Sequence, residues 1–396
     1  MLTEGSLSQV GCQAKQLTFS AHIDAATSRG LGIDTRNLWT SSSKRKGGAL
    51  LNSEGKEERF RALDGVRGIA ILLVLAGHTA ALPTAVHGVQ LFFVLSGFLI
   101  TRILLRGGQE IANGRLATQV FVKFYIRRAL RIMPAYYAVL FGGAVLDLPF
   151  FRTYMPWHAL YGSNILMWGI GSLLGPVSHF WSLAVEEQFY VVWPFLVLVV
   201  ARKKAVWLCV SAILIGCVAS YALFDAEKFS ALLPITEPCI FLGTGSLIAA
   251  ISRNVGLQRL ERICRIPALL GTAALAPIVI PISVAITATP IMLSALYGWF
   301  VVAAASGHPL LAALTWPPLR YVGMISYGLY LYHFPILLAI KSNWPNNQWA
   351  EVIGTNAASF ALAALSLRYF EIPIRQCSAR VVFYLVGEIR DKRPLQ

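Results

Sequence analysis

Residues 62–82 read ALDGVRGIAILLVLAGHTAAL, an apolar stretch that is long enough to cross a bilayer and carries three ionisable side chains. A membrane-spanning helix needs about 20 mostly apolar residues. Ten stretches meet this requirement, and we place the predicted spans at roughly 65–82, 86–105, 134–151, 183–200, 205–224, 232–251, 268–286, 289–305, 322–340 and 350–367. Residues 154–178 are also apolar, but Pro and Gly interrupt them, so we predict an interfacial or re-entrant segment there. The sequence predicts an all-α polytopic membrane protein with about ten transmembrane helices.

The composition of the whole chain agrees with this fold class. Of its 396 residues 56% are hydrophobic and 13% are charged, about half the charged share of an ordinary globular domain. A soluble chain of this size needs many polar residues to cover its surface, and this chain has too few of them. The composition therefore excludes an ordinary cytosolic enzyme. The six cysteines show no CxxC spacing, so we expect neither a disulfide framework nor a metal site.

The net charge of +15 would suggest a nucleic-acid partner in a soluble protein. With the N-terminus in the cytoplasm, 30 of the 34 Lys and Arg residues fall on the inner side of the predicted topology, three fall outside, and Arg67 lies within the first span. Cytoplasmic loops of membrane proteins carry this excess of basic residues. We therefore predict that both termini are cytoplasmic and that membrane lipids, not nucleic acid, are the partner of the basic charge.

The chain divides into three predicted regions. Residues 1–60 are rich in Ser, Thr and Gly, carry a basic SSSKRKGG patch and lack a signal-peptide pattern. They read as a flexible cytoplasmic extension, or as the result of a start codon placed too early. A membrane domain over 61–375 and a cytoplasmic tail over 376–396 follow.

The ionisable residues of the first span are functional candidates, because charges inside a membrane are costly. Arg67 and His78 are eleven residues apart, which puts them on one helix face roughly 16 Å apart. Asp64 lies three residues before Arg67, near the same stripe. Gly65, Gly68 and Gly77 allow another helix or a ligand to come close. The alternative is a structural Asp64–Arg67 ion pair beside a packed histidine.

A second candidate group is the arginine cluster in KFYIRRALRIMPAYY, residues 123–137. Arg127, Arg128 and Arg131 can form one cationic patch because they are three and four residues apart. We expect Pro134 to open the next helix, which places this patch at the inner surface. Arginine binds phosphates through its planar fork, although the patch can also be a topological anchor.

Glu186 and Glu187 lie in HFWSLAVEEQFYVVWP, residues 179–194, at the outer end of the fourth span. His78 lies in the same outer half of the membrane, so a glutamate can meet the imidazole and hold its tautomer. The alternative is a pair of solvated surface acids.

Polar residues also occur within the second, ninth and tenth predicted helices. Ser96 lies near the middle of the second span, where it can bind substrate or bond to the carbonyl one turn back. Tyr330 and His333 form a loose polar stripe with Tyr327 at i, i+3 and i+6, or an aromatic belt. In RYFEIPIR we expect an inner-surface ion network of Arg368, Glu371 and Arg375.

Together these segments resemble the integral-membrane acyltransferases of family three, which O-acylate bacterial surface carbohydrates and some macrolides. The matching pieces are RALDGVRGIAILLVLAGH, with the family's Arg-x10-His as Arg67 and His78, then GVQLFFVLSGFLIT, FYIRRALRIMPAYY and HFWSLAVEEQFYVVWP. ISYGLYLYHFPI and FEIP match more loosely. The resemblance covers about residues 60–375. About 20 residues follow FEIPIR, so we expect a stand-alone member without the SGNH domain of many relatives, and Thr236-Glu237-Pro238 before Gly243 departs from some of them.

The resemblance implies an enzyme of the bacterial inner membrane that moves an acyl group, most often acetyl, from acyl-CoA to a carbohydrate hydroxyl. No bound cofactor is implied. His78 would be the general base, oriented by Glu186 or Glu187, and Arg67 would pair with Asp64 or contact the donor. Arg127, Arg128 and Arg131 would hold the CoA nucleotide, with Ser96, Tyr330 and His333 as further substrate-binding residues. The acceptor would be O-antigen, exopolysaccharide, a lipo-oligosaccharide or a macrolide sugar.

The rival interpretation is a proton-coupled transporter or flippase for a sugar or glycolipid. It would use Glu186, Glu187 and His78 as a proton relay. The sequence shows no internal repeat, which is against many transporter folds.

Overall fold

The computed structural model describes residues 50–200, 204–222, 229–273, 282–377, 381 and 384–385. All regular structure in these ranges is helical. Residues Lys56–Gln396 form one compact unit. Most of the predicted extension and nearly all of the predicted tail lie outside the described residues, although helix α2 begins at Leu50, before the predicted boundary at residue 60.

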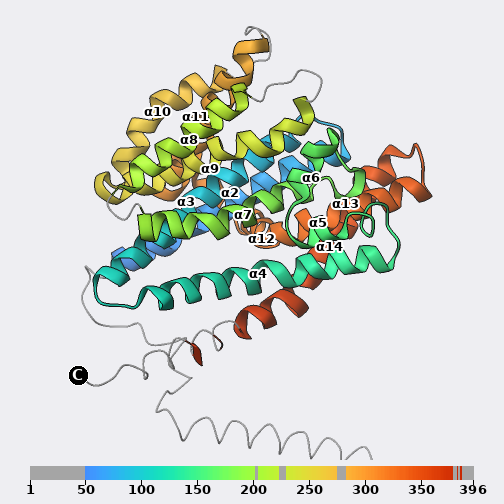
Figure 1. The fold of residues 1–396 in the computed structure, drawn as a ribbon, viewed down its shortest axis with the longest axis horizontal. Helices are drawn as coiled ribbons and strands as arrows, with labels where there is room; N and C mark the ends of the chain where they lie inside the picture. The colour runs from blue at the N-terminus through green and yellow to red at the C-terminus, as the bar shows by residue number, and fades with distance from the viewer. Residues whose placement is uncertain are drawn as a thin grey trace, which may run out of the picture. The chain divides into compact units, whose positions relative to one another are not determined.

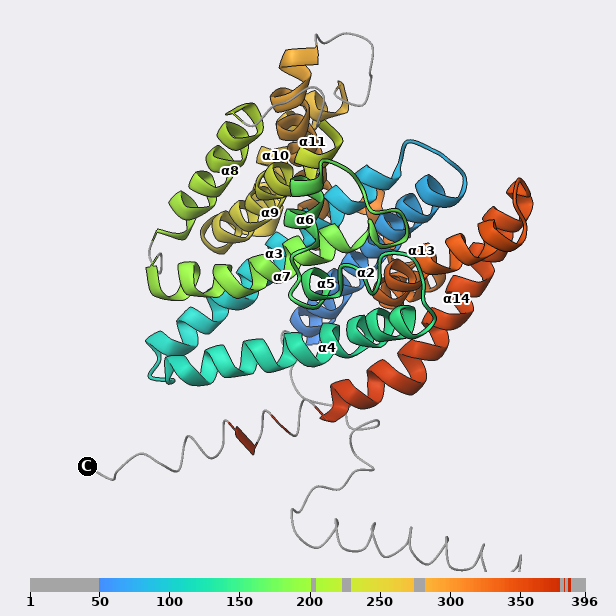
Figure 2. The same cartoon turned by 45° about the vertical axis from the view of Figure 1, so that its right-hand side comes forward.

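Figures 1 and 2 show how the helices of this unit are arranged, with α2, α3 and α7 between a group of α8 to α11 and the pair α13 and α14. The helices are α2 (Leu50–Thr79), α3 (Ala85–Ala112), α4 (Ala117–Val145), α5 (Met155–Ala159), α6 (Ser163–Ile170), α7 (Phe180–Phe195), α8 (Ala205–Ala222), α9 (Phe229–Val255), α10 (Leu257–Ala273), α11 (Ile282–Ser306), α12 (Pro317–Met324), α13 (Ser326–Asn343) and α14 (Thr355–Ser366). Short 3₁₀ turns occur at η2 (Gly175–Val177) and η4 (Pro309–Thr315), and π turns at η3 (Leu196–Val200), η5 (Ala350–Gly354) and η6 (Leu367–Glu371).

Within the described ranges, six helical segments are long and apolar enough to cross a membrane. They are Arg61–Thr79, Ala85–Ala112, Phe180–Val199, Ala205–Ala222, Thr289–Ser306 and Ala350–Cys377. A seventh results if α12 and α13, which meet at a bend of 66°, are taken as one broken span. The fold is therefore that of an all-helical membrane protein, while the count of ten spans and the cytoplasmic termini stay predictions.

Two predicted helix boundaries are wrong. Pro134 does not open a helix but lies inside the continuous helix α4. A proline inside a helix removes the N–H that would donate to the carbonyl four residues earlier, here that of Leu130, and membrane helices tolerate such a proline. The predicted break between the seventh and eighth spans, at residues 287–288, lies inside α11.

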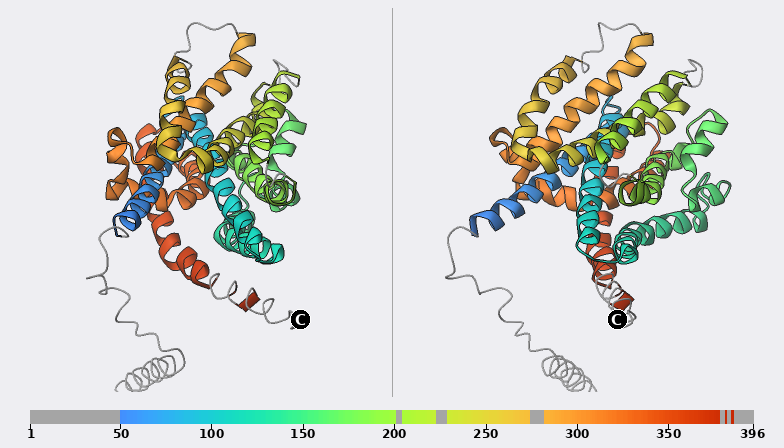
Figure 3. Two further views of the ribbon diagram at one scale, coloured as in Figure 1. Left: turned by 90° about the vertical axis from the view of Figure 1, so that its left-hand side faces the viewer. Right: turned by 60° about the vertical axis from the view of Figure 1, so that its left-hand side comes forward.

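The predicted re-entrant segment over residues 154–178 consists of short pieces. Helices α5 and α6 have five and eight residues, and the 3₁₀ turn η2 has three. None of them is long enough to cross a bilayer by itself. They connect α4 to α7, which Figure 3 shows in two further views.

The first contact that shapes the site is the close approach of α2 to η4 and α12. A Cβ atom on Gly65 would lie 2.0 Å from the carbonyl oxygen of Leu314, and one on Gly323 would lie 1.8 Å from that of Asp64. These distances leave no room for a side chain, so glycine permits the two backbones to touch. The prediction that the glycines of the first span admit another helix is confirmed.

The second contact is the crossing of α3 and α9, where Gly97 and Gly245 face the partner backbone. A Cβ on Gly97 would lie 2.1 Å from the carbonyl oxygen of Leu242, and one on Gly245 would lie 2.0 Å from that of Val94. The hydroxyl of Thr101 donates to Ser246 at 2.9 Å beside this crossing. The crossing fixes the position of α3, which carries Ser96.

We expect Gly245→Ala to destabilise the protein, because the added methyl group overlaps the α3 backbone. Overpacking of this kind costs about 1–3 kcal/mol, and the measurement is the midpoint of thermal unfolding in detergent. Gly142→Ala is the matched control, since a Cβ there meets no atom within 4 Å and alanine improves helix propensity by up to about 1 kcal/mol. Equal midpoints for the two variants would contradict the close crossing of α3 and α9.

Candidate active site

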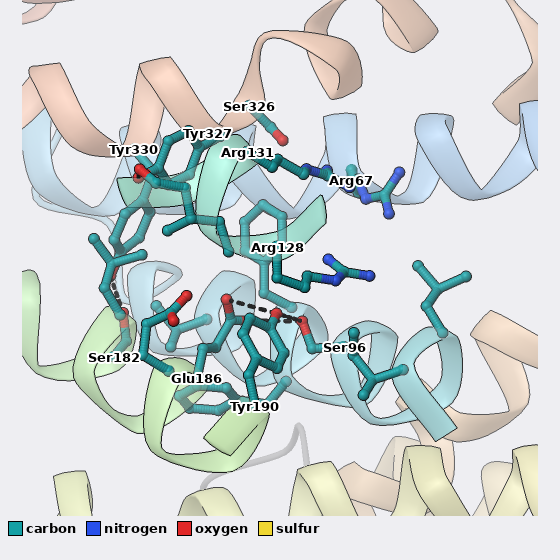
Figure 4. Close-up of a pocket in the computed structure, with 18 residues that line it drawn as sticks. Arg67, Ser96, Arg128, Arg131, Ser182, Glu186, Tyr190, Ser326, Tyr327 and Tyr330 are labelled. Atoms are coloured by element: carbon teal, nitrogen blue, oxygen red, sulfur yellow. Dashed lines mark hydrogen bonds between the residues drawn. The ribbon is translucent and has the colours of Figure 1, made fainter. Parts of the chain in front are cut away.

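A narrow cavity of about 100 Å³ lies among α2, α3, α4, α7 and α13 (Figure 4). Seven of the predicted site residues line it: Arg67, Ser96, Arg128, Arg131, Glu186, Glu187 and Tyr330. In Figure 4 the arginines lie toward one end of the cavity, while Glu186, Ser182 and Tyr330 lie toward the other. The cavity therefore has a cationic end and an end rich in hydroxyl and carboxyl groups.

Ser96 on α3 faces Glu186 on α7 across this cavity. The Ser96 hydroxyl donates to Glu186 Oε1 at 2.6 Å, and Tyr190 donates to Glu186 Oε2 at 3.3 Å. The alternative that Ser96 bonds to a backbone carbonyl is wrong. One oxygen of the neighbouring Glu187, Oε1, is buried and has no hydrogen-bond partner among the described residues. The two glutamates are thus interior groups and not solvated surface acids.

The cationic end is held by specific contacts. Arg67 donates to Asp64 at 2.7 Å on the same helix, which confirms the ion pair, and Arg67 also lines the cavity. The guanidinium of Arg128 lies 5.3 Å from the ring centre of Tyr190, a distance at which cation–π attraction operates. Asp64 is not among the residues that line the cavity, and its contact with the site is the bond to Arg67.

A wider pocket of about 380 Å³ adjoins the cationic end, because Arg128 and Arg131 line both spaces. Arg127 lines this outer part of the site together with Lys123, Glu110 and Arg375. The three arginines of α4 therefore share one pocket, as predicted. Glu110 is paired with Arg115 and lies 3.8 Å from Lys123.

Arg375 is a member of this pocket that the sequence did not identify as a site residue. Its spacing from Glu371 predicted an ion pair, and Arg375 donates to Glu371 at 2.5 Å. Arg368, expected in the same network, instead lies over the ring of Tyr369 at 5.4 Å. Arg368 and Arg375 are seven residues apart and would share one face of a regular α-helix, so the motif RYFEIPIR holds no signal that separates them.

His78 meets His333 instead of a glutamate. His78 Nδ1 lies 2.9 Å from His333 Nε2, and the two rings are stacked with centres 5.1 Å apart. Glu186 bonds to Ser96 and Tyr190, so the predicted orientation of His78 by Glu186 or Glu187 is wrong. Glu186 faces Ser96 on α3 and not the end of α2 that carries His78.

The hydrogen bonds of His333 determine the tautomers of a neutral pair. His333 Nδ1 faces the carbonyl oxygens of Tyr330 at 2.7 Å and Leu329 at 3.1 Å. A carbonyl can only accept, so Nδ1 carries the proton of His333 and Nε2 carries a lone pair. His78 must then donate from Nδ1, which leaves a lone pair on its Nε2. His333 was predicted to bind substrate, and the structure gives it this orienting contact.

The histidine pair begins one helical turn beyond the cavity. The ring centres of Tyr330 and His333 are 5.7 Å apart, and the Tyr330 hydroxyl bonds to Ser182 at 2.5 Å. The aromatic-belt alternative for Tyr330 and His333 is wrong, because both side chains are buried. His179, which sequence reasoning passed over in the motif HFWSLAVEE, lies 5.5 Å from the His333 ring.

Comparisons with known proteins identify the family of the chain. A family model described as an acyltransferase domain matches residues 60–368. Peptidoglycan O-acetyltransferase OatA of Listeria monocytogenes is 28% identical over 359 residues, covering 80% of this chain and 56% of the relative. A putative peptidoglycan O-acetyltransferase of Bacillus subtilis, YrhL, is 30% identical over 359 residues, with 79% and 54% covered. No solved structure matches significantly.

The alignments cover more of this chain than of its relatives. The chain spans about half the length of the curated relatives it matches. A putative O-acetyltransferase of Staphylococcus aureus is 35% identical over 149 residues, covering 33% of this chain and 24% of the relative. The family match includes both histidines of the pair and the arginines of α4. The chain therefore belongs to family three of the integral-membrane acyltransferases.

Proposed function

We propose that the protein is a membrane O-acetyltransferase that moves an acetyl group from acetyl-CoA to a hydroxyl of a cell-surface or lipid-linked carbohydrate. The observation that carries this proposal is the order of groups along the site. The arginine pocket leads to the narrow cavity, then to Tyr330, and then to the His78–His333 pair. Arg67 and His78, eleven residues apart on α2, are separated by about 16 Å along the helix axis.

A CoA thioester matches this order of groups. Its phosphates and its reactive carbonyl lie at opposite ends of a long, flexible pantetheine arm. Arg127, Arg128 and Arg131 bind the phosphates through charge-assisted hydrogen bonds. The 380 Å³ pocket receives the nucleotide, and the narrower cavity receives the arm. On the predicted topology the arginine pocket faces the cytoplasm, where acyl-CoA is available.

The polar groups inside the cavity bind the arm. Pantetheine carries two amide groups, each with one donor and one acceptor, and these must be satisfied in a site that excludes water. The carboxylate of Glu187 accepts from an amide N–H group and the guanidinium of Arg128 donates to an amide carbonyl, while Ser96 keeps its donor on Glu186. Arg67, held by Asp64, adds a cation where the arm leaves the phosphates.

His78 acts as the general base. Its Nε2 takes the proton of the acceptor hydroxyl while the hydroxyl oxygen attacks the thioester carbon. The C–S bond then breaks, and the imidazolium returns the proton to the departing thiolate, so free CoA and an O-acetyl ester are formed. His333 accepts the hydrogen bond from His78 Nδ1 throughout, which orients the ring and stabilises the imidazolium.

The acceptor is a carbohydrate in this proposal. The names of two relatives specify peptidoglycan as the acceptor of an O-acetyl group. Peptidoglycan therefore joins O-antigen, exopolysaccharide, lipo-oligosaccharide and macrolide sugars among the acceptor classes. The cell membrane of a bacterium, the inner membrane where two are present, is the place where cytoplasmic acetyl-CoA and a lipid-linked sugar meet.

We expect His78→Ala to abolish acetyl transfer because it removes the base. The loss should reach about 10²–10⁴-fold, measured as labelled acetyl transferred from acetyl-CoA to carbohydrate in membranes of a producing strain. His308→Ala is the control, since His308 lies between α11 and η4 near Glu261, outside the site. Both variants should reach wild-type membrane abundance. Full transfer by His78→Ala would remove the base assignment, and sugar uptake without acetyl-CoA would favour a transporter.

We expect the role of His333 to depend on its hydrogen-bond acceptor. His333→Leu fills the space but cannot accept from His78 Nδ1, so kcat should fall about 10²-fold while KM for acetyl-CoA is unchanged. His333→Gln offers a carbonyl oxygen as acceptor and should retain more activity. The measurement is steady-state kinetics of the purified protein. Equal losses in the two variants would show that packing, and not the acceptor, accounts for the effect.

A further inference from the structure

The wide pocket draws its cations from two distant parts of the sequence. Arg127, Arg128 and Arg131 come from α4, while Arg375 comes from helical residues 372–377, which follow η6. Glu371 holds Arg375 in place through the 2.5 Å bond and is itself only 4% exposed. The buried carboxylate of Glu371 therefore fixes the position of the Arg375 side chain in the pocket.

The arginines lie at different points along the path of the proposed donor. Arg128 and Arg131 line both the wide pocket and the narrow cavity, so they lie at the junction. Arg375 lines only the wide pocket. In CoA the pyrophosphate joins the pantetheine arm directly, whereas the ribose 3′-phosphate lies beyond it. A donor whose arm enters the cavity would thus bring its pyrophosphate to the junction and its 3′-phosphate farther out.

We propose that Arg375 binds the ribose 3′-phosphate of CoA and that Glu371 positions its guanidinium for this contact. The inference rests on the proposed function, in which acetyl-CoA is the donor. The guanidinium has five N–H donors in a planar fork, so its bond to Glu371 leaves it suited to a phosphate as well.

The charges of the pocket favour an anion at this place. Arg131 and Arg375 are close enough to interact electrostatically, and Arg131 in turn interacts with Arg67. Several like charges in a partly buried pocket repel one another, and a bound phosphate relieves that repulsion. Glu110 is the acid among the polar lining residues, and its carboxylate is paired with Arg115 and Lys123. The 3′-phosphate supplies the additional anion near Arg375.

The test is a comparison of CoA with 3′-dephospho-CoA, measured as binding to the full-length protein in detergent by calorimetry. This binding measurement requires no acceptor, so it can be made without the carbohydrate substrate. Wild-type protein should bind CoA about tenfold or more tightly than 3′-dephospho-CoA, because a charge-assisted hydrogen bond is lost. Arg375→Gln should weaken CoA binding by that factor and leave 3′-dephospho-CoA binding unchanged.

Three further variants make the result specific. Arg368→Gln is the matched control, because Arg368 lies seven residues earlier and over Tyr369 instead of in the pocket, and it should bind both ligands as the wild type does. Arg131→Gln, at the junction, should weaken both ligands. Arg375→Lys keeps the charge without the fork and should fall between wild type and Arg375→Gln, with folding checked by thermal unfolding.

Each other outcome has a distinct meaning. If wild-type protein binds the two ligands equally, or if Arg375→Gln weakens both alike, the assignment to the 3′-phosphate is overturned while the acyl-CoA donor stands. If wild-type protein binds neither ligand, the donor assignment itself fails and this inference fails with it.

Discussion

The close contact of α2 with η4 and α12 is the constraint on which the site depends. Gly65 and Gly323 leave so little room that the two backbones touch, with carbonyl oxygens at the positions where a Cβ would be. This contact fixes one end of α2, and with it Asp64 and Arg67. Because α12 and α13 meet at a 66° bend, the same contact also directs α13 along α2. His333 thereby reaches His78, 255 residues away in the chain.

Contacts between residues of the same helix could be predicted from the sequence, because helix geometry determines which neighbouring side chains lie on one face. The eleven-residue spacing of Arg67 and His78 placed them on one face, and the three arginines of α4 were expected as one patch. The Asp64–Arg67 ion pair follows from a separation of three residues. In each case the partners lie on a single helix, where 3.6 residues per turn determines which side chains meet.

Contacts between distant helices were not predictable in the same way. Glu186 and His78 were expected to meet because both lie in the outer half of the membrane, but depth leaves the rotation of each helix undetermined. Glu186 faces Ser96 on α3, and His78 faces α13. Likewise Arg368 and Arg375 would share one helix face by their spacing, yet Arg375 lines the wide pocket and Arg368 lies over Tyr369. Pro134 was expected to open a helix but lies inside α4, because a membrane helix tolerates an interior proline.

The cost of burying charge explains why the two ends of the site differ. An unpaired charge in a low-dielectric interior is costly, so each cation in the narrow cavity lies near an acid or an aromatic ring, as Arg67 does with Asp64 and Arg128 with Tyr190. The wide pocket has more cations than acids among its lining residues. Such a surplus suits an anionic ligand, whereas the histidine end can stay neutral until a proton is transferred.

The hydrogen bonds of the histidine pair also bear on the choice between acyl transfer and proton-coupled transport. The rival relay was expected to run through Glu186, Glu187 and His78. His78 bonds to His333 and Glu186 bonds to Ser96 and Tyr190. A relay also needs each member to pass a proton onward, but His333 Nδ1 donates to backbone carbonyls of Leu329 and Tyr330. A carbonyl oxygen in this position cannot take up a proton at neutral pH, so the relay from His78 ends at His333. A proton that His78 takes from an acceptor must therefore leave by the side on which it arrived. Acyl transfer requires this return, because the departing thiolate needs the proton that the hydroxyl lost. Because the proton path ends at His333, the pair favours a transferase, which takes up and returns one proton within a turnover. A proton-coupled transporter must instead move the proton across the membrane.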